Sequence, residues 1–428
     1  MKATCYNLIN VLDGHRLQDQ GWTIADPQSQ GPSLVKAEYE TREFTPDPSE
    51  DGLYRYHNWL PVKRSLKGSC APVTYKSKGL AEVMGLSNLY ITLSGWYPEV
   101  GARFATCTFK ETEAYSVCAR LDADEKRVLV VASAGNTARA FAQVCSSNRI
   151  PVVISIPADN MQSMWFAQPL DPCVKIIASP AHSDYFDAIT LADKLCTDPM
   201  FLAEGGAKNI ARRDGMGTTL LSALEAIGTI PDAYFQAVGS GTGAIAVWEN
   251  NLRLIEDSRF GYKKMRLMTA QNSPFCIMTE SWKQHSRKLV DISADDARNA
   301  CEKIKAKVLS NRKPPYSLAG GLFDALEDTN GNMYAVNNEQ LDKWAQTFEE
   351  KEGVDLNPAA AVAVAALAQA VENGDVNKDD IIMLNITGAG EKKIQSQLGN
   401  AIFYAKPALV LDPEADAAEI VEKVKSLF

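Results

Sequence analysis

The chain has few of the residues and spacings from which proteins build metal sites. It contains only four histidines, and its nine cysteines are widely spaced with no C-x-x-C pair. Because a zinc site needs three or four such ligands, usually at short spacings, the sequence predicts no metal site. An odd number of scattered cysteines is typical of free thiols in a reducing compartment, so we expect the protein to be cytoplasmic.

Basic charge and long apolar runs are scarce as well. Lysine and arginine number 44 and aspartate and glutamate 53, which gives a net charge of −9 at pH 7. This balance argues against nucleic acid or an anionic membrane as the main partner. The longest apolar run, residues 358–371, is too short to span a bilayer and predicts a buried helix. No apolar segment follows Lys2, so the N-terminus does not resemble a signal peptide.

The apolar content is nevertheless high enough for a large folded core. The 428 residues are 46% hydrophobic and 23% charged, enough for two domains or one large α/β unit. Short buried strands, such as residues 127–132 and 151–156, alternate with predicted helices over residues 138–146, 184–195 and 295–309. This alternation predicts a parallel sheet, in which ligands bind at the carboxyl ends of the strands.

A glycine-rich turn over residues 239–243 is the clearest candidate for an anion site. The segment Gly239-Ser240-Gly241-Thr242-Gly243 lies between an apolar run and an apolar-periodic segment, which predicts strand, turn and helix. Backbone N–H groups in such a turn, with the positive end of the helix, bind phosphate. The spacing matches neither the dinucleotide fingerprint nor a Walker loop. Taken alone, the segment is equally typical of a turn that only packs a helix on a strand.

Other polar segments fall at similar places. Thr108 and Glu111 predict a capping box that puts Lys110 in the first turn of a helix, although a lone lysine is more often a solvated side chain. The turns at residues 133–137 and 387–390 each follow a predicted buried strand. Residues 207–215 hold three cations and a glycine, which is typical of an anion site or, equally, of an exposed basic helix face.

The order of these motifs resembles that of fold-type II pyridoxal-phosphate (PLP) enzymes of the threonine synthase superfamily. The matching motifs are Thr108-Phe109-Lys110-Glu111, residues 133–137, 204–209, 239–243 and 385–388. Residues 55–62, 94–99, 234–249 and 311–336 look more closely like the cysteate synthase family. The resemblance covers residues 66–395, and the occurrence of these motifs in the right order makes it more specific than any one of them.

This resemblance implies a tryptophan synthase β-like α/β fold, with two three-layer domains built on parallel sheets and an N-terminal extension. The expected boundaries are residues 1–65 for the extension, 66–108 and 229–428 for a large PLP-binding domain, and 109–228 for a small mobile domain. We also expect a homo-oligomer, either a dimer or a trimer. Of the N-terminal cysteine pair that binds metal in some relatives, only Cys5 is present.

The resemblance also implies a role for each motif. Lys110 is expected to bind PLP covalently and to act as the base for the substrate Cα proton. The other cofactor-binding residues implied are Asn136 at O3′, Gly239, Ser240, Gly241, Thr242 and Gly243 at the phosphate, and Thr387 at the pyridine nitrogen. The implied substrate-binding residues are Ser133, Ala134, Gly135 and Thr137 for the carboxylate, and Arg212, with Lys208 and Asn209 beside it, for the phosphate.

The activity implied by the family is a β-replacement that converts O-phospho-L-serine and sulfite into L-cysteate and phosphate, a route to coenzyme M. Threonine synthases usually carry aspartate after the lysine, where this chain has Glu111, and have a shorter segment than residues 96–106 before it. These departures indicate a remodelled substrate side. The alternatives are a threonine synthase-like or specialised β/γ-replacement enzyme with another substrate or nucleophile, and an inactive PLP-fold binding module.

Overall fold

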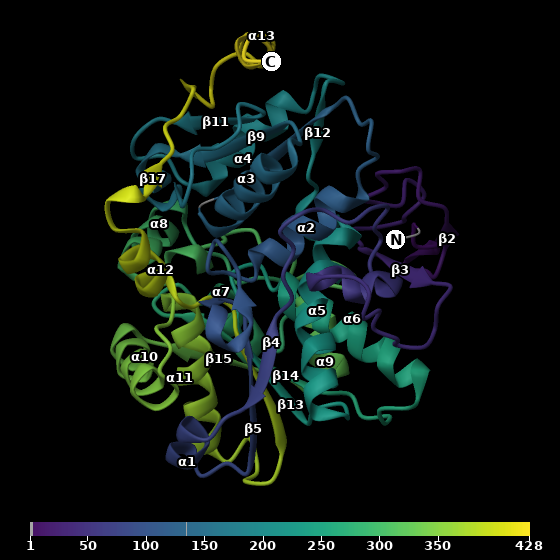
Figure 1. The fold of residues 1–428 in the computed structure, drawn as a ribbon, viewed down its shortest axis with the longest axis vertical. Helices are drawn as coiled ribbons and strands as arrows, with labels where there is room; N and C mark the ends of the chain where they lie inside the picture. Colours follow the sequence, from purple (N-terminus) through teal and green to yellow (C-terminus); the bar gives the residue numbers. More distant parts are fainter. Residues whose placement is uncertain (1–2, 134) are drawn as a thin grey trace.

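Two sheets of mostly parallel strands lie one above the other in the computed structural model of the chain, which describes residues 3–133 and 135–428 (Figure 1). Helices cover both faces of each sheet. Because both faces of such strands are buried, uninterrupted apolar runs are favoured over alternating ones, as the sequence shows for residues 128–131. The predicted α/β architecture is confirmed.

The larger sheet occupies the lower half of Figure 1 and has the strand order β15-β14-β13-β16-β5-β4. Neighbouring strands run parallel except β4, which is antiparallel to β5. Its strands are β4 (Val73–Lys76), β5 (Asn88–Leu93), β13 (Ala233–Ala237), β14 (Arg266–Asn272), β15 (Asn332–Val336) and β16 (Ile381–Ile386).

Helices pack on both faces of this sheet. On one face lies α11 (Pro358–Asn373), and on the other lie α5 (Ile210–Ile227) and α6 (Thr242–Asp257). Almost every alanine, valine and leucine of α11 is buried, so the apolar run predicted to be a buried helix is one. Within residues 3–133 and 135–428, no helix has both the length and the apolar character that crossing a membrane requires.

The smaller sheet is parallel, with the strand order β12-β8-β9-β11-β18. Successive residues of β8 point to opposite faces: Leu129 and Val131 pack with α3, whereas Val128 and Val130 pack with α4 and α13. Its elements are β8 (Val128–Ala132), β9 (Val152–Pro157), β11 (Val174–Ser179), β12 (Phe201–Ala203), β18 (Leu409–Val410), α3 (Asn136–Asn148), α4 (Tyr185–Leu195) and α13 (Ala417–Lys425).

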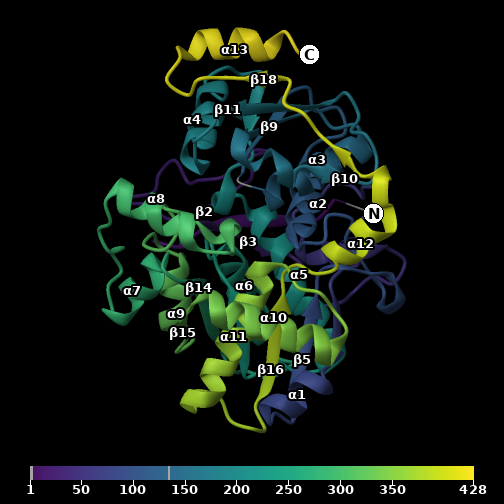
Figure 2. The same ribbon diagram turned by 90° about the vertical axis from the view of Figure 1, so that its left-hand side faces the viewer.

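The C-terminal segment returns to the smaller sheet. After α12 (Glu391–Leu398), β17 (Phe403–Tyr404) pairs with β10 (Trp165–Phe166), β18 pairs with β11, and α13 packs on α4 (Figure 2). The boundaries expected from the sequence put these residues with the larger sheet. Strands of two residues have no periodicity that a sequence could reveal, because they are too short to alternate.

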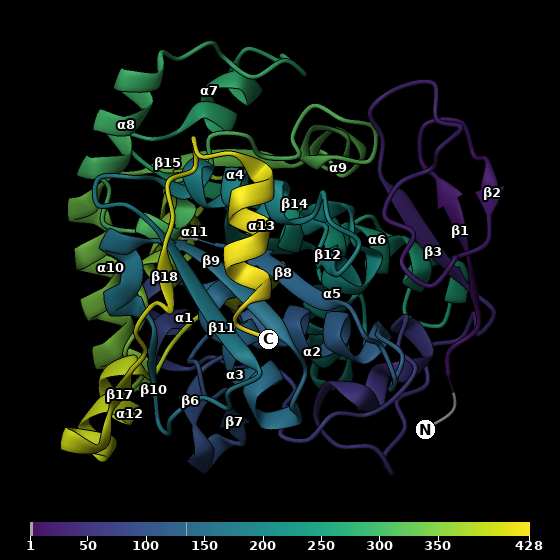
Figure 3. The same ribbon diagram turned by 90° about the horizontal axis from the view of Figure 1, so that it is seen from above.

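The N-terminal extension forms a three-stranded antiparallel sheet beside α5 and α6 (Figure 3). Its strands are β1 (Tyr6–Asn10), β2 (Arg16–Leu17) and β3 (Val35–Tyr39). The Tyr39 hydroxyl donates a 2.6 Å hydrogen bond to Asp214 of α5, and Arg253 of α6 contacts the same carboxylate at 2.7 Å. These buried contacts make the extension part of the folded body.

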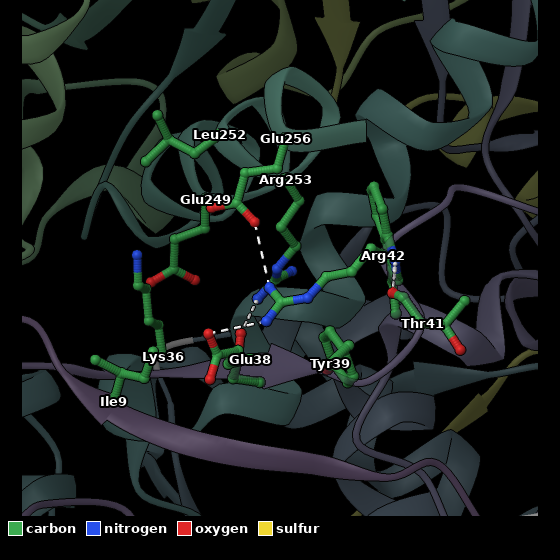
Figure 4. A pocket seen from close by; sticks show the side chains of 12 residues that line it. Ile9, Lys36, Glu38, Tyr39, Thr41, Arg42, Glu249, Leu252, Arg253 and Glu256 are labelled. Atoms are coloured by element: carbon green, nitrogen blue, oxygen red, sulfur yellow. Dashed lines mark hydrogen bonds and ion pairs between the residues drawn. The ribbon is translucent and has the colours of Figure 1, made fainter. Parts of the chain in front are cut away.

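A small hollow lies between β3 and α6. Arg42 extends across it and lies 3.0 Å from Glu38 and 3.3 Å from Glu256 (Figure 4). Arg42 therefore pairs with two of the carboxylates that line the hollow, away from the strand ends at which parallel sheets bind ligands.

The remaining elements connect these layers. They are α1 (Gly79–Met84), α2 (Lys110–Arg120), α7 (Ile277–Lys283), α8 (Ala294–Lys303), α9 (Leu322–Asp328), α10 (Asn338–Glu352), β6 (Trp96–Tyr97), β7 (Ala102–Arg103), and the 3-10 helices η1 (Gly52–Trp59), η2 (Pro98–Val100), η3 (Ala158–Ser163), η4 (Gly206–Lys208), η5 (Lys307–Leu309) and η6 (Gly399–Ala401).

Candidate active site

The beginning of α2 is bound to the segment that follows β16. The N–H of Phe109 donates to the carbonyl of Thr387 (2.9 Å), and the N–H of Ala389 donates to the carbonyl of Cys107 (3.0 Å). Cys107 has a positive φ of 57°, which lets the chain turn sharply just before the helix begins. Lys110, the first residue of α2, is thereby brought next to the Thr387 segment, as the motif order implied.

The segment after β16 needs glycine because other chain segments approach it closely. A Cβ atom on Gly388 would lie 2.6 Å from the side-chain nitrogen of Asn357, and one on Gly390 would lie 2.5 Å from the carbonyl oxygen of Trp96. Real Cβ contacts are not that short, so no larger residue fits without a shift of backbone or side chain. Thr387 is held between these contacts and is itself buried.

The 133–137 turn connects the carboxyl end of β8 to α3. The Ser133 hydroxyl accepts a hydrogen bond from the N–H of Gly135 (3.1 Å), and Asn136 is the first residue of α3. The Thr137 hydroxyl donates to Glu113 on α2 (2.8 Å), so the turn is joined to the helix that carries Lys110. Ala134, also implied in substrate binding, lies outside the described residues.

The 239–243 turn lies at the carboxyl end of β13 and leads into α6. Gly241 has φ +78°, and a Cβ atom there would lie 2.9 Å from Leu322. The hydroxyls of Ser240 and Thr242 lie 2.8 Å apart at the positive end of this long helix. The turn thus combines two hydroxyls with N-terminal N–H groups, a donor set that suits a phosphate monoester.

Residues 304–309, predicted to be part of a helix, instead cover this turn. Helix α8 ends at Lys303, because Ile304 is extended, and η5 follows. A Cβ atom on Gly239 would lie 3.0 Å from the carbonyl oxygen of Val308. The turn is therefore shielded on one side by η5.

Glu113 links Lys110 to Arg212. Its Oε2 lies 3.3 Å from Nζ of Lys110 and accepts from Nε of Arg212 at 3.2 Å, and its Oε1 accepts from Nη2 of Arg212 at 2.7 Å. Glu113 is fully buried and Arg212 is 12% exposed. A two-point arginine–carboxylate contact of this kind fixes both groups geometrically.

Burial and neighbouring charges set the protonation states of Lys110 and Glu113. Burial lowers the pKa of Lys110, an effect that the carboxylate of Glu113 opposes without cancelling it. Burial raises the pKa of Glu113, but Arg212 and Lys110 outweigh it, and the net shift is downward. Glu113 is therefore ionised, and Lys110 is converted to a neutral amine more readily than a solvated lysine.

Glu204 approaches the guanidinium of Arg212 at the nitrogen that Glu113 does not contact. Its Oε2 lies 3.3 Å from Nη1 of Arg212 and accepts the N–H of Gly206 at 3.0 Å. Burial raises the pKa of Glu204, Arg212 opposes the rise, and Glu113 adds to it. Arg212, which was expected to bind the substrate phosphate, thus contacts two buried carboxylates.

Asn209 and Lys208 occupy different surroundings. The side chain of Asn209 is fully buried, caps α5 at the N–H of Ala211 (3.0 Å) and accepts from Arg120 (2.9 Å). Its amide donates to the backbone carbonyl of Glu204 (2.7 Å). Asn209 therefore holds the start of α5 and the Glu204 backbone in place, whereas Lys208 is exposed at the end of η4.

Glu113 and Glu204 were given no role from the sequence. The spacing of three residues between Lys110 and Glu113 places both on one face of a helix and is a signal that could have identified Glu113. Glu204 begins the 204–209 motif, but the spacing does not reveal its contact with Arg212, which depends on how the chain folds between them.

The residues of the site fit PLP. Lys110 offers an amine with a lowered pKa, and the 239–243 turn offers a phosphate cradle whose close packing a Cβ atom would disturb. Thr387 offers a hydroxyl beside the start of α2. Among residues 3–133 and 135–428, no three histidine, cysteine, aspartate or glutamate side chains gather as metal ligands would.

Comparison with known proteins adds independent information. The family model described as "Pyridoxal-phosphate dependent enzyme" matches residues 102–388. A curated cysteate synthase of Methanosarcina acetivorans is 44% identical over 390 residues, which are 91% of this chain and 93% of the relative. A cysteate synthase of Methanocella paludicola is 42% identical over 399 residues, 92% of each chain.

Solved structures resemble the chain at the level of the fold. Maize serine racemase has a TM-score of 0.58 at 15% identity and covers 76% of this chain and 91% of its own. The serine racemase of Dictyostelium discoideum has a TM-score of 0.52 at 14% identity, with 74% and 91% covered.

Proposed function

The chain belongs to the cysteate synthase family of pyridoxal-phosphate dependent enzymes, and from this membership we propose that it converts O-phospho-L-serine and sulfite into L-cysteate and phosphate. The observation that carries the proposal is 44% identity across 91% of this chain and 93% of a cysteate synthase. The same comparisons confirm the predicted fold-type II architecture, the enzyme class and the PLP cofactor. They do not favour a threonine synthase-like enzyme or an inactive module.

The cofactor-binding roles of individual residues remain proposals. Bound PLP supplies an electron sink that stabilises the negative charge left at a substrate Cα when its proton is removed. Lys110 is proposed to hold PLP covalently, the 239–243 turn its phosphate, Asn136 its O3′ and Thr387 its pyridine nitrogen. A threonine hydroxyl adds no negative charge at that nitrogen and does not keep it protonated. We expect this to favour loss of a Cβ substituent over transfer of the amino group.

Lys110 is proposed to move the Cα proton. Burial lowers the pKa of Lys110, so its Nζ reaches the neutral, proton-accepting form at lower cost than in water. Glu113, three residues further along α2, lies 3.3 Å from Nζ and stabilises the ammonium formed when the proton is taken. The lysine then returns the proton to Cα at the end of the replacement.

The substrate is proposed to bind through its two anionic ends. The N–H groups of the 133–137 turn, at the positive end of α3, suit the carboxylate. The phosphate is assigned to Arg212. Arg212 and Lys110 contact the same buried carboxylate, that of Glu113, and Glu113 also accepts from Thr137 of the 133–137 turn. In the replacement the Cβ–O bond to phosphate breaks and a Cβ–S bond to sulfite forms.

The assay that tests this function uses the purified protein loaded with PLP. It is mixed with O-phospho-L-serine and sulfite, and cysteate and phosphate are measured; a parallel sample receives O-phosphohomoserine and water. We expect cysteate in the first sample and no threonine in the second. Threonine without cysteate would overturn the proposal and return the chain to threonine synthesis.

We also propose that the protein is a cytoplasmic homo-oligomer, either a dimer or a trimer. The support is its likeness in sequence and fold to PLP enzymes. Light scattering coupled to size-exclusion chromatography measures the mass in solution, and a mass of about one chain would contradict the proposal.

A further inference from the structure

The guanidinium of Arg212 is contacted on two sides by unequal partners. Glu113 accepts from Nε at 3.2 Å and from Nη2 at 2.7 Å, so it holds one whole edge. Glu204 reaches only Nη1, at 3.3 Å. A two-point contact on one side and a single longer contact on the other make Glu204 the partner that is easier to replace.

Glu113 is also fixed from other directions. Its Oε1 accepts from the Thr137 hydroxyl of α3 at 2.8 Å, and its Oε2 faces Lys110 at 3.3 Å. Three elements, α2, α3 and α5, thus contribute contacts to one fully buried carboxylate. Removing Glu113 from Arg212 breaks several contacts at once.

Glu204 has weaker ties. Its Oε1 is buried and accepts no hydrogen bond from any residue that the structure describes, and the whole residue is only 5% exposed. Its Oε2 accepts the N–H of Gly206 at 3.0 Å. A buried carboxylate with one oxygen unpaired pays a desolvation cost that only part of its contacts offset.

The position of this Oε2 is itself a small oxyanion site. The N–H of Gly206 donates to it at 3.0 Å, and Nη1 of the Arg212 cation lies 3.3 Å from it. Gly205 and Gly206 both have positive φ, 95° and 57°, which turns the chain so that this N–H faces the Glu204 carboxylate. An oxygen of a phosphomonoester can accept from the same two groups.

We propose that Glu204 is an internal substitute for the substrate phosphate: it occupies the anion position on Arg212 and Gly206, and the phosphate displaces it, while Glu113 keeps Arg212 in place. This inference rests on the proposed assignment of the substrate phosphate to Arg212. It explains why two glycines follow Glu204, since they orient the N–H of Gly206 toward the anion position. It also makes Glu204 a residue that sets the affinity for the anion. An anion that binds Arg212 and Gly206 too weakly to displace the Glu204 carboxylate is thereby excluded from this position.

The test is a calorimetric titration of the PLP-loaded protein with inorganic phosphate. Loading fills the 239–243 turn, so the phosphate that binds is not the cofactor's. Glu204→Gln keeps the shape of the side chain but removes its charge, and we expect phosphate to bind about tenfold more tightly, the change that one charge-assisted contact corresponds to. Arg212→Gln should abolish this binding.

The chain offers a matched control at the adjacent arginine. Glu249 is also buried and pairs with Arg213 at 3.1 Å, but it lies on α6 and does not contact Arg212. Glu249→Gln should leave the phosphate affinity unchanged. Should Glu204→Gln fail to fold, Glu204→Ala removes both the charge and the side chain that occupies the anion position, and it should also bind phosphate more tightly.

Equal, weaker or undetectable phosphate binding by a folded Glu204 variant would overturn the inference. This outcome is separate from failure of the proposed function, which is measured as cysteate formation by the unaltered protein. Tighter phosphate binding by the variant without cysteate formation by the unaltered protein would leave the inference standing and the reaction unassigned.

Discussion

Oε2 of Glu113 lies 3.3 Å from Nζ of Lys110, three residues earlier on α2. The same carboxylate binds Arg212, so one buried negative charge stands between the proposed cofactor-binding lysine and the proposed phosphate-binding arginine. The site is therefore organised around an anion that the motifs of the sequence did not single out.

Lys110→Ala should abolish the visible absorbance of the bound cofactor and cysteate formation together. The reason is that alanine removes the amine proposed to hold PLP and to take the Cα proton. Absorbance spectra and product analysis measure the two effects. Lys126→Ala, at an exposed lysine outside the site, is the control and should keep the spectrum. A Lys110→Ala protein with unchanged absorbance would show that another lysine binds PLP.

Glu113→Gln should lower kcat/KM about 100-fold and the free energy of unfolding by about 3 kcal/mol. Both site cations lose a buried partner, and among the described residues Glu204 is then the one carboxylate that still contacts Arg212. Because Glu113 opposes the lowering of the pKa of Lys110, its loss should lower that pKa further. PLP uptake by the cofactor-free protein, which requires the neutral amine, should then shift to lower pH.

The control for this change is again Glu249→Gln, which also removes a buried arginine partner. It should destabilise the protein, as measured by urea unfolding, without moving the pH dependence of PLP uptake. If the Glu113→Gln and Glu249→Gln proteins have the same uptake profile, Glu113 has only a structural role.

Gly241→Val should weaken PLP binding by about tenfold or more, while the affinity for phosphate at Arg212 changes little. The new side chain meets Leu322 at 2.9 Å and adopts an unfavourable φ of +78° at the turn. Equilibrium titration with PLP measures the loss. Gly353→Val is a matched control, because Gly353 has φ +72° but no neighbouring atom within 4 Å and ends α10. The reverse order of losses would mean that the two phosphates have been exchanged in our assignment.

The affinity for sulfate should rise as the pH falls through the raised pKa of Glu204. Burial raises that pKa, and protonation removes the charge that competes for Arg212. The other groups that face Glu204 are Arg212 of α5, Glu113 and Lys110 of α2, and Tyr185 of α4. Burial raises the pKa of Tyr185, so it stays neutral, and the pKa of Arg212 is raised despite burial because Glu113 and Glu204 outweigh that effect, so it stays charged.

Sulfate is the suitable probe because its charge is constant over this range, unlike that of phosphate. Calorimetric titration of the PLP-loaded protein at several pH values gives the affinity. In the Glu204→Gln protein the rise at low pH should be absent. A rise of equal size in both proteins would assign the pH dependence to another group.

The parallel sheets and the segments at their strand ends could be predicted because each depends on local pattern. The run of residues 128–132 is apolar throughout, and the 239–243 turn contains three glycines, so strand and turn are visible without any partner. The C-terminal segment could not be placed, because β18 has two residues and joins the smaller sheet only through its contact with β11. Likewise residues 304–309, expected to continue the helix of α8, lie over the 239–243 turn.

The sequence by itself determined the motifs, their order and hence the family and its cofactor, because each motif depends on particular glycine, lysine and threonine residues at fixed positions along the chain. The tertiary structure alone decided which charges meet. Glu113, Thr137, Glu204 and Arg212 come from four separate elements and share one buried volume. The pKa shifts of Glu113, Glu204 and Arg212 arise from burial and mutual charge, two quantities that depend on distance in space and not on distance along the chain.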